Sequence, residues 1–188
     1  MKKIALGISI IFGFSLISAT MDHESILTDQ QLLNATKHLE AFSKVNDQPQ
    51  FILSAVAGAC APSARMADGI HDNKYINVYI NEKGFEDMTG KKKPRFAIGT
   101  MILKEKMGLV QDSVLKQGAT ELFTIMIKRE KGYNPDCGDW EFASLDVKTS
   151  KIERGKISSC QHCHTSCAET DFVFRTNYLG KQYADALK

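Results

Sequence analysis

The fold is indicated most clearly by residues 121–129, which read ELFTIMIKR. This stretch is the most strand-like part of a period-two pattern that begins at residues 75–81, and we expect it to form a β-strand. Residues 99–105, within the segment 96–106, and residues 140–147 predict two further strands. The segment 131–139, between the last two, is dense in turn-forming residues. Because short linkers favour antiparallel neighbours, the sequence predicts a mostly antiparallel sheet.

A helix is expected at residues 28–44, before the sheet. Thr28 and Gln31 have the spacing of a capping box, and apolar residues recur after them at helical intervals. Residues 55–69 are rich in Gly, Ala and Pro and read as a loop or short turn. The predicted fold class is therefore α+β, an antiparallel sheet with a few packed helices, in a single domain over residues 21–188.

The N-terminus has the features of a secretory signal over residues 1–20. Lys2 and Lys3 precede an uncharged apolar run that is too short to span a bilayer comfortably, and small residues follow it. We expect cleavage there, export to the periplasm and no membrane span in the mature chain. The remainder has 22 basic and 22 acidic residues, a balance that gives no basis for nucleic-acid binding.

Near the C-terminus the chain carries a C-x-x-C-H motif, formed by Cys160, Cys163 and His164. This spacing is the one used to attach a c-type haem: the two thiols add to the porphyrin vinyl groups and the histidine binds the iron. A zinc or iron–sulfur site that includes Cys167 is the alternative interpretation. An exported cluster of thiolates would be exposed to oxidation, which argues against it.

The other cysteines and the second axial position of the iron are less determined. Cys60 and Cys137 are the expected disulfide pair, which leaves Cys167 as a thiol near the haem. Residues 165–188 contain neither Met nor His, the residues that commonly fill the sixth position of an electron-transfer haem. We therefore favour an open distal site. An internal methionine as ligand, which would make the protein a plain electron carrier, is the alternative.

The haem motif together with residues 170–174 resembles the C-terminal signature of the cytochrome P-460 and cytochrome c′-beta family. The upstream elements 96–105, 126–129 and 138–140 occur in the same order. The resemblance implies a mostly antiparallel β fold, a homodimer, and one haem c with His164 as its only protein ligand. It also implies a small nitrogen-containing ligand and a redox partner cytochrome.

The family has two functional branches. In one, a lysine is bonded to the porphyrin and the haem oxidises hydroxylamine; Lys104 resembles that lysine. Because alternate residues of a strand share a face, Lys104 lies with Ile102 and opposite Glu105. A strand-end lysine reaching solvent is the alternative. In the other branch the haem binds nitric oxide under an aromatic cap, for which Phe96 is the candidate, and an ordinary core residue is the alternative.

Overall fold

The computed structural model describes residues 27–52, 73–110, 113–175 and 178–184. Its centre is one antiparallel sheet of seven strands, in the order β1-β3-β4-β5-β6-β7 with β2 also paired to β3. The strands are β1 (Ser43–Lys44), β2 (Gln50–Ile52), β3 (Lys74–Ile80), β4 (Met101–Val110), β5 (Ser113–Lys128), β6 (Trp140–Asp146) and β7 (Ile152–Gly155). The expected α+β class and the antiparallel sheet are confirmed.

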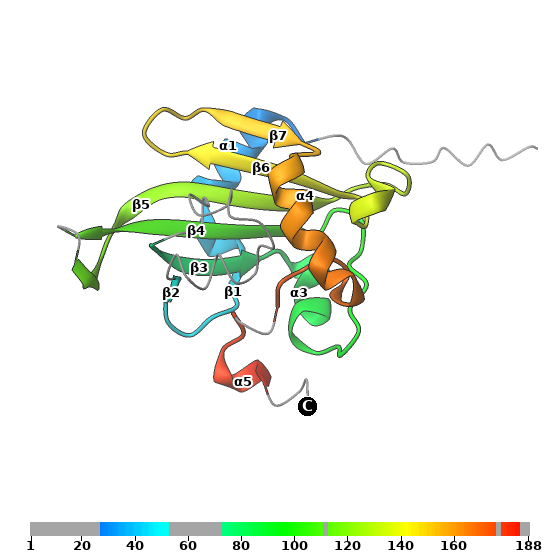
Figure 1. Ribbon diagram of the computed structural model, residues 1–188, viewed down its shortest axis with the longest axis horizontal. Coiled ribbons are helices and arrows are strands. Elements are labelled where there is room, and N and C mark those ends of the chain that lie inside the picture. Colours follow the sequence, from blue (N-terminus) through cyan, green and yellow to red (C-terminus); the bar gives the residue numbers. More distant parts are fainter. Residues whose placement is uncertain (1–26, 53–72, 111–112, 176–177, 185–188) are drawn as a thin grey trace, which may run out of the picture.

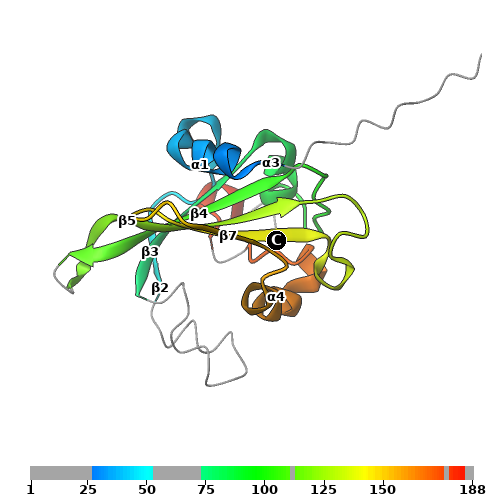
Figure 2. The same cartoon turned by 90° about the horizontal axis from the view of Figure 1, so that it is seen from above.

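Helices cover both faces of this sheet. Helix α1 (Asp29–Lys37) lies on one face and α4 (Ser158–His164) on the other, as Figure 2 shows with the sheet seen edge-on. The remaining helical elements connect or flank the strands: η1 (Leu39–Ala41), α3 (Glu82–Thr89), η3 (Pro135–Cys137), η4 (Thr165–Thr170) and α5 (Lys181–Ala184) (Figure 1). None of the described helices is long and apolar enough to span a bilayer.

The alternation along β4 divides the interior into two cores. Met101 and Leu103 belong to the core under α1. Ile102 belongs to the core on the α4 side, together with Trp140 and Phe142 of β6. This second core also contacts Cys160, so the sheet face under α4 is the one that faces the C-x-x-C-H segment.

The predicted helix at 28–44 is shorter than expected. Its start is confirmed, because Thr28 is the N-cap and forms a capping box with Gln31. The helix ends at Lys37, however, and Ser43–Lys44 is strand β1, paired with the end of β3. Tertiary pairing along the sheet edge therefore replaces the last predicted turns of the helix.

The capping box gives a stability prediction. The Thr28 hydroxyl accepts from the Gln31 backbone at 3.2 Å, and the Gln31 side chain accepts from the Thr28 backbone at 2.7 Å. Thr28→Ala is expected to lower the free energy of unfolding by about 1 kcal/mol, measured by denaturant titration. Gln30→Ala, at an exposed position of the same turn, is the control and should change it by less than about 0.5 kcal/mol. Equal losses in the two variants would contradict the capping role.

Candidate haem site

The C-x-x-C-H motif lies on the short helix α4. Cys160 and Cys163 are three residues apart, which places them on neighbouring turns of one side of the helix. Cys160 is partly buried against the core under α4, and burial raises the pKa of its thiol. His164 ends the helix and is buried. The motif thus presents its first cysteine and its histidine to the sheet.

The imidazole of His164 is held with one nitrogen free. Its Nδ1 lies 2.6 Å from the carbonyl oxygen of Phe172, which can only accept a hydrogen bond. Nδ1 therefore carries the proton, and the Nε2 lone pair is available to a metal. Burial, followed by the charge of Lys104, lowers the pKa of His164 to about 3, so the ring is neutral. A neutral imidazole with its second nitrogen bonded to a carbonyl is the usual form of a metal-binding histidine.

Two aromatic rings fix the plane of this imidazole. The His164 ring centroid lies 5.2 Å from that of Phe142 on β6 and 5.1 Å from that of Phe174. Phe142 and Phe174 reach the ring from the sheet and from the segment after η4. Their packing leaves the imidazole little freedom to rotate.

The Phe172 carbonyl that orients His164 is itself held by Asp171. The Asp171 carboxylate accepts hydrogen bonds from Lys128 Nζ at 2.8 Å and from the Phe96 backbone at 2.9 Å. Its own carbonyl accepts from Trp140 Nε1 at 2.7 Å. These bonds tie the segment after the motif to β5 and β6. Sequence reasoning missed Asp171, and only its place in the family-like string 170–174 could have drawn attention to it.

This segment has an unusual backbone conformation. Asp171 and Phe172 are consecutive non-glycine residues with φ of 55° and 63°, and left-handed conformations cost roughly 1 kcal/mol or more each. Gly138 allows the turn to be tight, because a Cβ there would lie 2.5 Å from the Phe172 ring. The bonds to Asp171 hold a conformation that the chain would otherwise leave.

Lys104 is buried on the same side of the sheet as His164. It is only 6% exposed, and it pairs with Val78 of β3, which belongs to the core under α4. Its Nζ lies 4.5 Å from the ring centroid of Tyr178 and 5.9 Å from that of Phe174, the ring that also contacts His164. The amino group of Lys104 therefore lies close to the motif.

Glu105 points to the opposite face, as the strand alternation predicts. Its carboxylate accepts from the Tyr79 hydroxyl at 3.1 Å, from Asn77 at 3.0 Å and from Thr120 at 2.7 Å. Burial and the charge of Glu105 raise the pKa of Tyr79 to about 12. This carboxylate cannot act on a ligand at the motif from the far side of the sheet.

The sequence matches a known protein family. The sequence model of the family described as Cytochrome P460 matches residues 56–175, more than half of the chain. The chain belongs to the cytochrome P460 family. No curated protein matches the chain significantly.

Membership of the cytochrome P460 family implies a haem cofactor, and the residues of this chain fit that group. His164 offers a free Nε2, and Cys160 and Cys163 are placed on one helix beside it. Lys106, two residues after Lys104, is fully buried on the same face, and its Nζ has no hydrogen-bond partner in the described part of the chain. An apolar face with an unsatisfied amino group suits a pocket that a porphyrin and its ligand complete.

Phe96, the candidate cap of the family's gas-binding branch, is buried in the core under α4. Its ring packs edge-on against Trp140 at 5.5 Å, and its backbone N–H binds Asp171. The geometry gives this residue a clear structural role. Its role as a cap over the haem stays a prediction.

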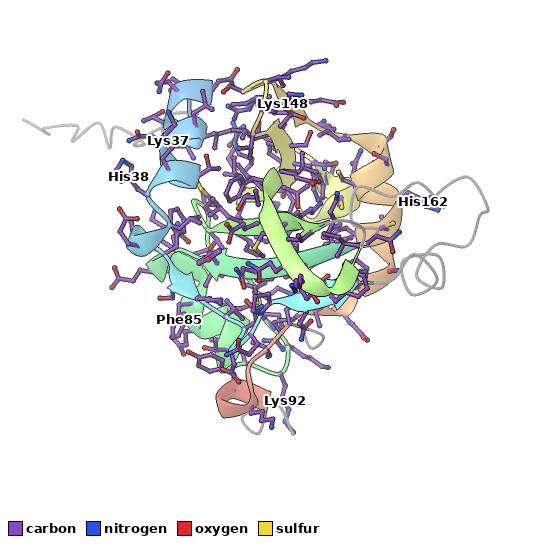
Figure 3. The ribbon with its side chains drawn as sticks, turned by 90° about the vertical axis from the view of Figure 1, so that its left-hand side faces the viewer. Lys37, His38, Phe85, Lys92, Lys148 and His162 are labelled. Carbon is purple, nitrogen blue, oxygen red and sulfur yellow. The ribbon has the colours of Figure 1, made fainter. Side chains whose placement is uncertain are left out.

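A second axial ligand would come from another histidine or from a methionine of the chain. His38 and His162 are exposed and point away from the sheet on opposite sides (Figure 3). Among the methionines, Met88 and Met126 are packed in the core under α4, whereas Met101 is in the core under α1. His23, His71 and Met66 lie outside the described residues.

Within the described part of the chain, neither Cys137 nor Cys167 forms a metal cluster with the motif. Cys137 is a fully buried free thiol, and burial raises its pKa to about 12. Cys167 is also free, and its thiol donates to the His164 carbonyl at 3.2 Å. Cys60, the expected partner of Cys137, lies outside the described residues. Across the described ranges, no three His, Cys, Asp or Glu side chains are grouped to hold a metal ion, so the zinc alternative gains no support there.

Proposed function

We propose that the protein is an exported c-type haem protein that binds nitric oxide or a related small nitrogen species at an open distal site. One haem c would be attached through Cys160 and Cys163 and ligated by His164. The haem supplies the metal that binds the ligand and exchanges electrons with a redox partner cytochrome. The protein would act in the periplasm as a homodimer, after removal of residues 1–20.

The observation that carries this proposal is the orientation of His164. Its Nδ1–H is bonded to Phe172, its ring is packed between two phenylalanines and its Nε2 is left free. Among the described residues no hydrogen bond engages Nε2, so its lone pair is available to a metal. His38 and His162, the other described histidines, are exposed, which favours a haem with one protein ligand.

Burial of Lys104 supports a second candidate function, hydroxylamine oxidation with a lysine–haem cross-link. The strand-end alternative would place its amino group in solvent, but it lies against Tyr178 and Phe174 instead. Aromatic faces hold the side chain in one position without consuming its nitrogen in an ion pair. A lysine held in this way, on the face of the motif, is positioned to react with a bound porphyrin.

One preparation distinguishes the two candidates. The protein would be purified from periplasm and its absorption spectrum recorded with and without nitric oxide. The masses of its haem-bearing tryptic peptides would then be measured by mass spectrometry. For the gas binder we expect a high-spin spectrum, a shift with nitric oxide, and no porphyrin bond to the peptide of Lys104. If the peptide of Lys104 is joined through haem to the peptide of the motif in the wild type but not in Lys104→Met, the result would support the hydroxylamine-oxidising enzyme. A low-spin spectrum that nitric oxide leaves unchanged would contradict both.

A further inference from the structure

The fully buried amino group of Lys106 is the polar feature that the proposed function leaves unexplained. Lys106 pairs with Ile76 on β3 and follows Lys104 by two residues, so both lysines face the core under α4. Its exposed fraction is 0%, and Nζ lacks a hydrogen-bond partner in the ranges described. Buried polar groups without partners are rare, and each calls for an explanation such as an unoccupied ligand position.

The charges around Lys106 come from three elements. Lys104 lies beside it on β4, Lys74 on β3, and the Cys160 thiol on α4. Lys74 is paired with Glu121. Burial, and then the charge of Lys104, lower the pKa of Lys106 far below its usual range. Because an ammonium group buried without a counter-charge or hydrogen bond is strongly disfavoured, the burial and missing partner of Nζ favour a neutral amine with a free lone pair.

Lys106 also lies among the residues that would hold the haem. Its amino group is an electrostatic neighbour of the Cys160 thiol and of the His164 imidazole, which are the first and last residues of the motif. Glu105, the nearest carboxylate in the sequence, is engaged on the other face of the sheet. Of these two neighbouring side chains, only the Lys106 amine faces the motif side of the sheet, where it is available as a base.

We propose that Lys106 Nζ is the proton acceptor for protic small ligands, such as hydroxylamine, hydrazoic acid or hydrogen cyanide, that enter the haem pocket. The inference rests on the proposed haem function. The step is a proton transfer: the ligand's O–H, N–H or C–H bond breaks, an N–H bond forms on Lys106, and no electron moves. The ligand is left as an anion, beside an ammonium group whose charge stabilises it.

The test is the rate of cyanide binding to the ferric holoprotein at neutral pH, where cyanide is almost entirely hydrogen cyanide and must lose its proton. Lys106→Met replaces the amine by an apolar side chain of similar length. Because Nζ has no partner to leave unpaired, the change should cost little stability. We expect the association rate constant to fall by about 100-fold or more, the usual contribution of a general base. Binding of carbon monoxide to the ferrous protein, which involves no proton, should change by less than about threefold.

Two further variants separate proton acceptance from charge. Lys106→Arg introduces a positive charge that cannot be lost and offers no lone pair, so its cyanide rate should be as low as that of Lys106→Met. Lys93→Met makes the same substitution at an exposed position and should behave as the wild type. A wild-type rate in either Lys106→Met or Lys106→Arg would overturn the inference.

The outcomes also separate this inference from the proposed function. If the wild-type protein carries no haem, or binds neither carbon monoxide nor nitric oxide, the proposed function fails. If it binds both while the Lys106 variants keep the wild-type cyanide rate, the inference that Lys106 accepts the proton fails and the proposed function stands. Should neither variant fold, the wild-type rate in heavy water decides, because transfer of a deuteron to the amine must be slower than transfer of a proton. Equal rates in the two solvents would overturn the inference.

Discussion

Replacing both Cys160 and Cys163 by serine is expected to abolish covalent haem in the exported protein. Serine hydroxyls do not add to vinyl groups as thiols do, so the porphyrin would lose both attachments while His164 remains. The measurement is haem staining after denaturing electrophoresis of protein made in cells competent to mature c-type cytochromes. The wild type should stain and the double variant should not.

Cys167→Ser is the matched control for this prediction. Cys167 is three residues beyond the motif and carries a free, partly buried thiol, but its sulfur is turned to the His164 carbonyl. This variant should keep the covalent haem of the wild type. Loss of staining in Cys167→Ser, or its retention in the double serine variant, would show that the haem is not attached through the C-x-x-C-H pair.

Asp171→Ala is expected to lower the free energy of unfolding by about 3 kcal/mol. The side chains of Asp171 and Lys128 are only 8% and 13% exposed, so removal of the carboxylate leaves a buried ammonium without its counter-charge. The Phe96 backbone N–H loses its acceptor as well. Lys128 keeps one bond, to the Gly138 carbonyl at 2.7 Å, which places the expected loss at the lower end of the range for broken buried pairs.

Denaturant unfolding of the apoprotein measures this loss without any contribution from the haem. Glu169→Ala removes a carboxylate two residues away, at an exposed position of η4, and should cost less than about 0.5 kcal/mol. In the holoprotein, Asp171→Ala should also move the iron–histidine stretching frequency, because the Phe172 carbonyl that bonds His164 would no longer be fixed. An unchanged frequency together with unchanged stability would show that Asp171 does not hold the Phe172 carbonyl in place.

The central strands could be predicted because their pattern is local. Residues 75–81 and 140–147 coincide with β3 and β6 to within one residue at each end. Strand β5 begins at Ser113, eight residues before the predicted start, in a stretch interrupted by Gly118. That extension depends on pairing with the end of β4, where the register shifts, and no local pattern encodes it.

Short edge elements and the motif helix could not be predicted for the same reason. Strands β1 and β7 have two and four residues, too few to show a period. Helix α4 is built from Ser, Cys, Gln and His, of which only Gln is a strong helix former, and its N-cap makes no side-chain hydrogen bond. Its conformation is therefore set by packing on the sheet rather than by the sequence of the helix itself.

The site could be predicted in part. The C-x-x-C-H motif is read directly from the sequence, and the face occupied by Lys104 follows from the alternation along a strand, which the structure reproduces. The same alternation places Lys106 beside Lys104, but its complete burial depends on the covering elements. The hydrogen bonds of Asp171 join it to residues 96, 128 and 140, which only the folded chain brings together.

The fixed His164 ring has a consequence for cofactor uptake. A flexible ligand loses rotamer freedom when it binds a metal, at a cost of roughly 0.5–1.5 kcal/mol for each immobilised side chain. Here the carbonyl and the two phenylalanine rings have already imposed that order during folding. The apoprotein is thus a preorganised receptor, and metal coordination can favour the folded chain with little further entropic penalty.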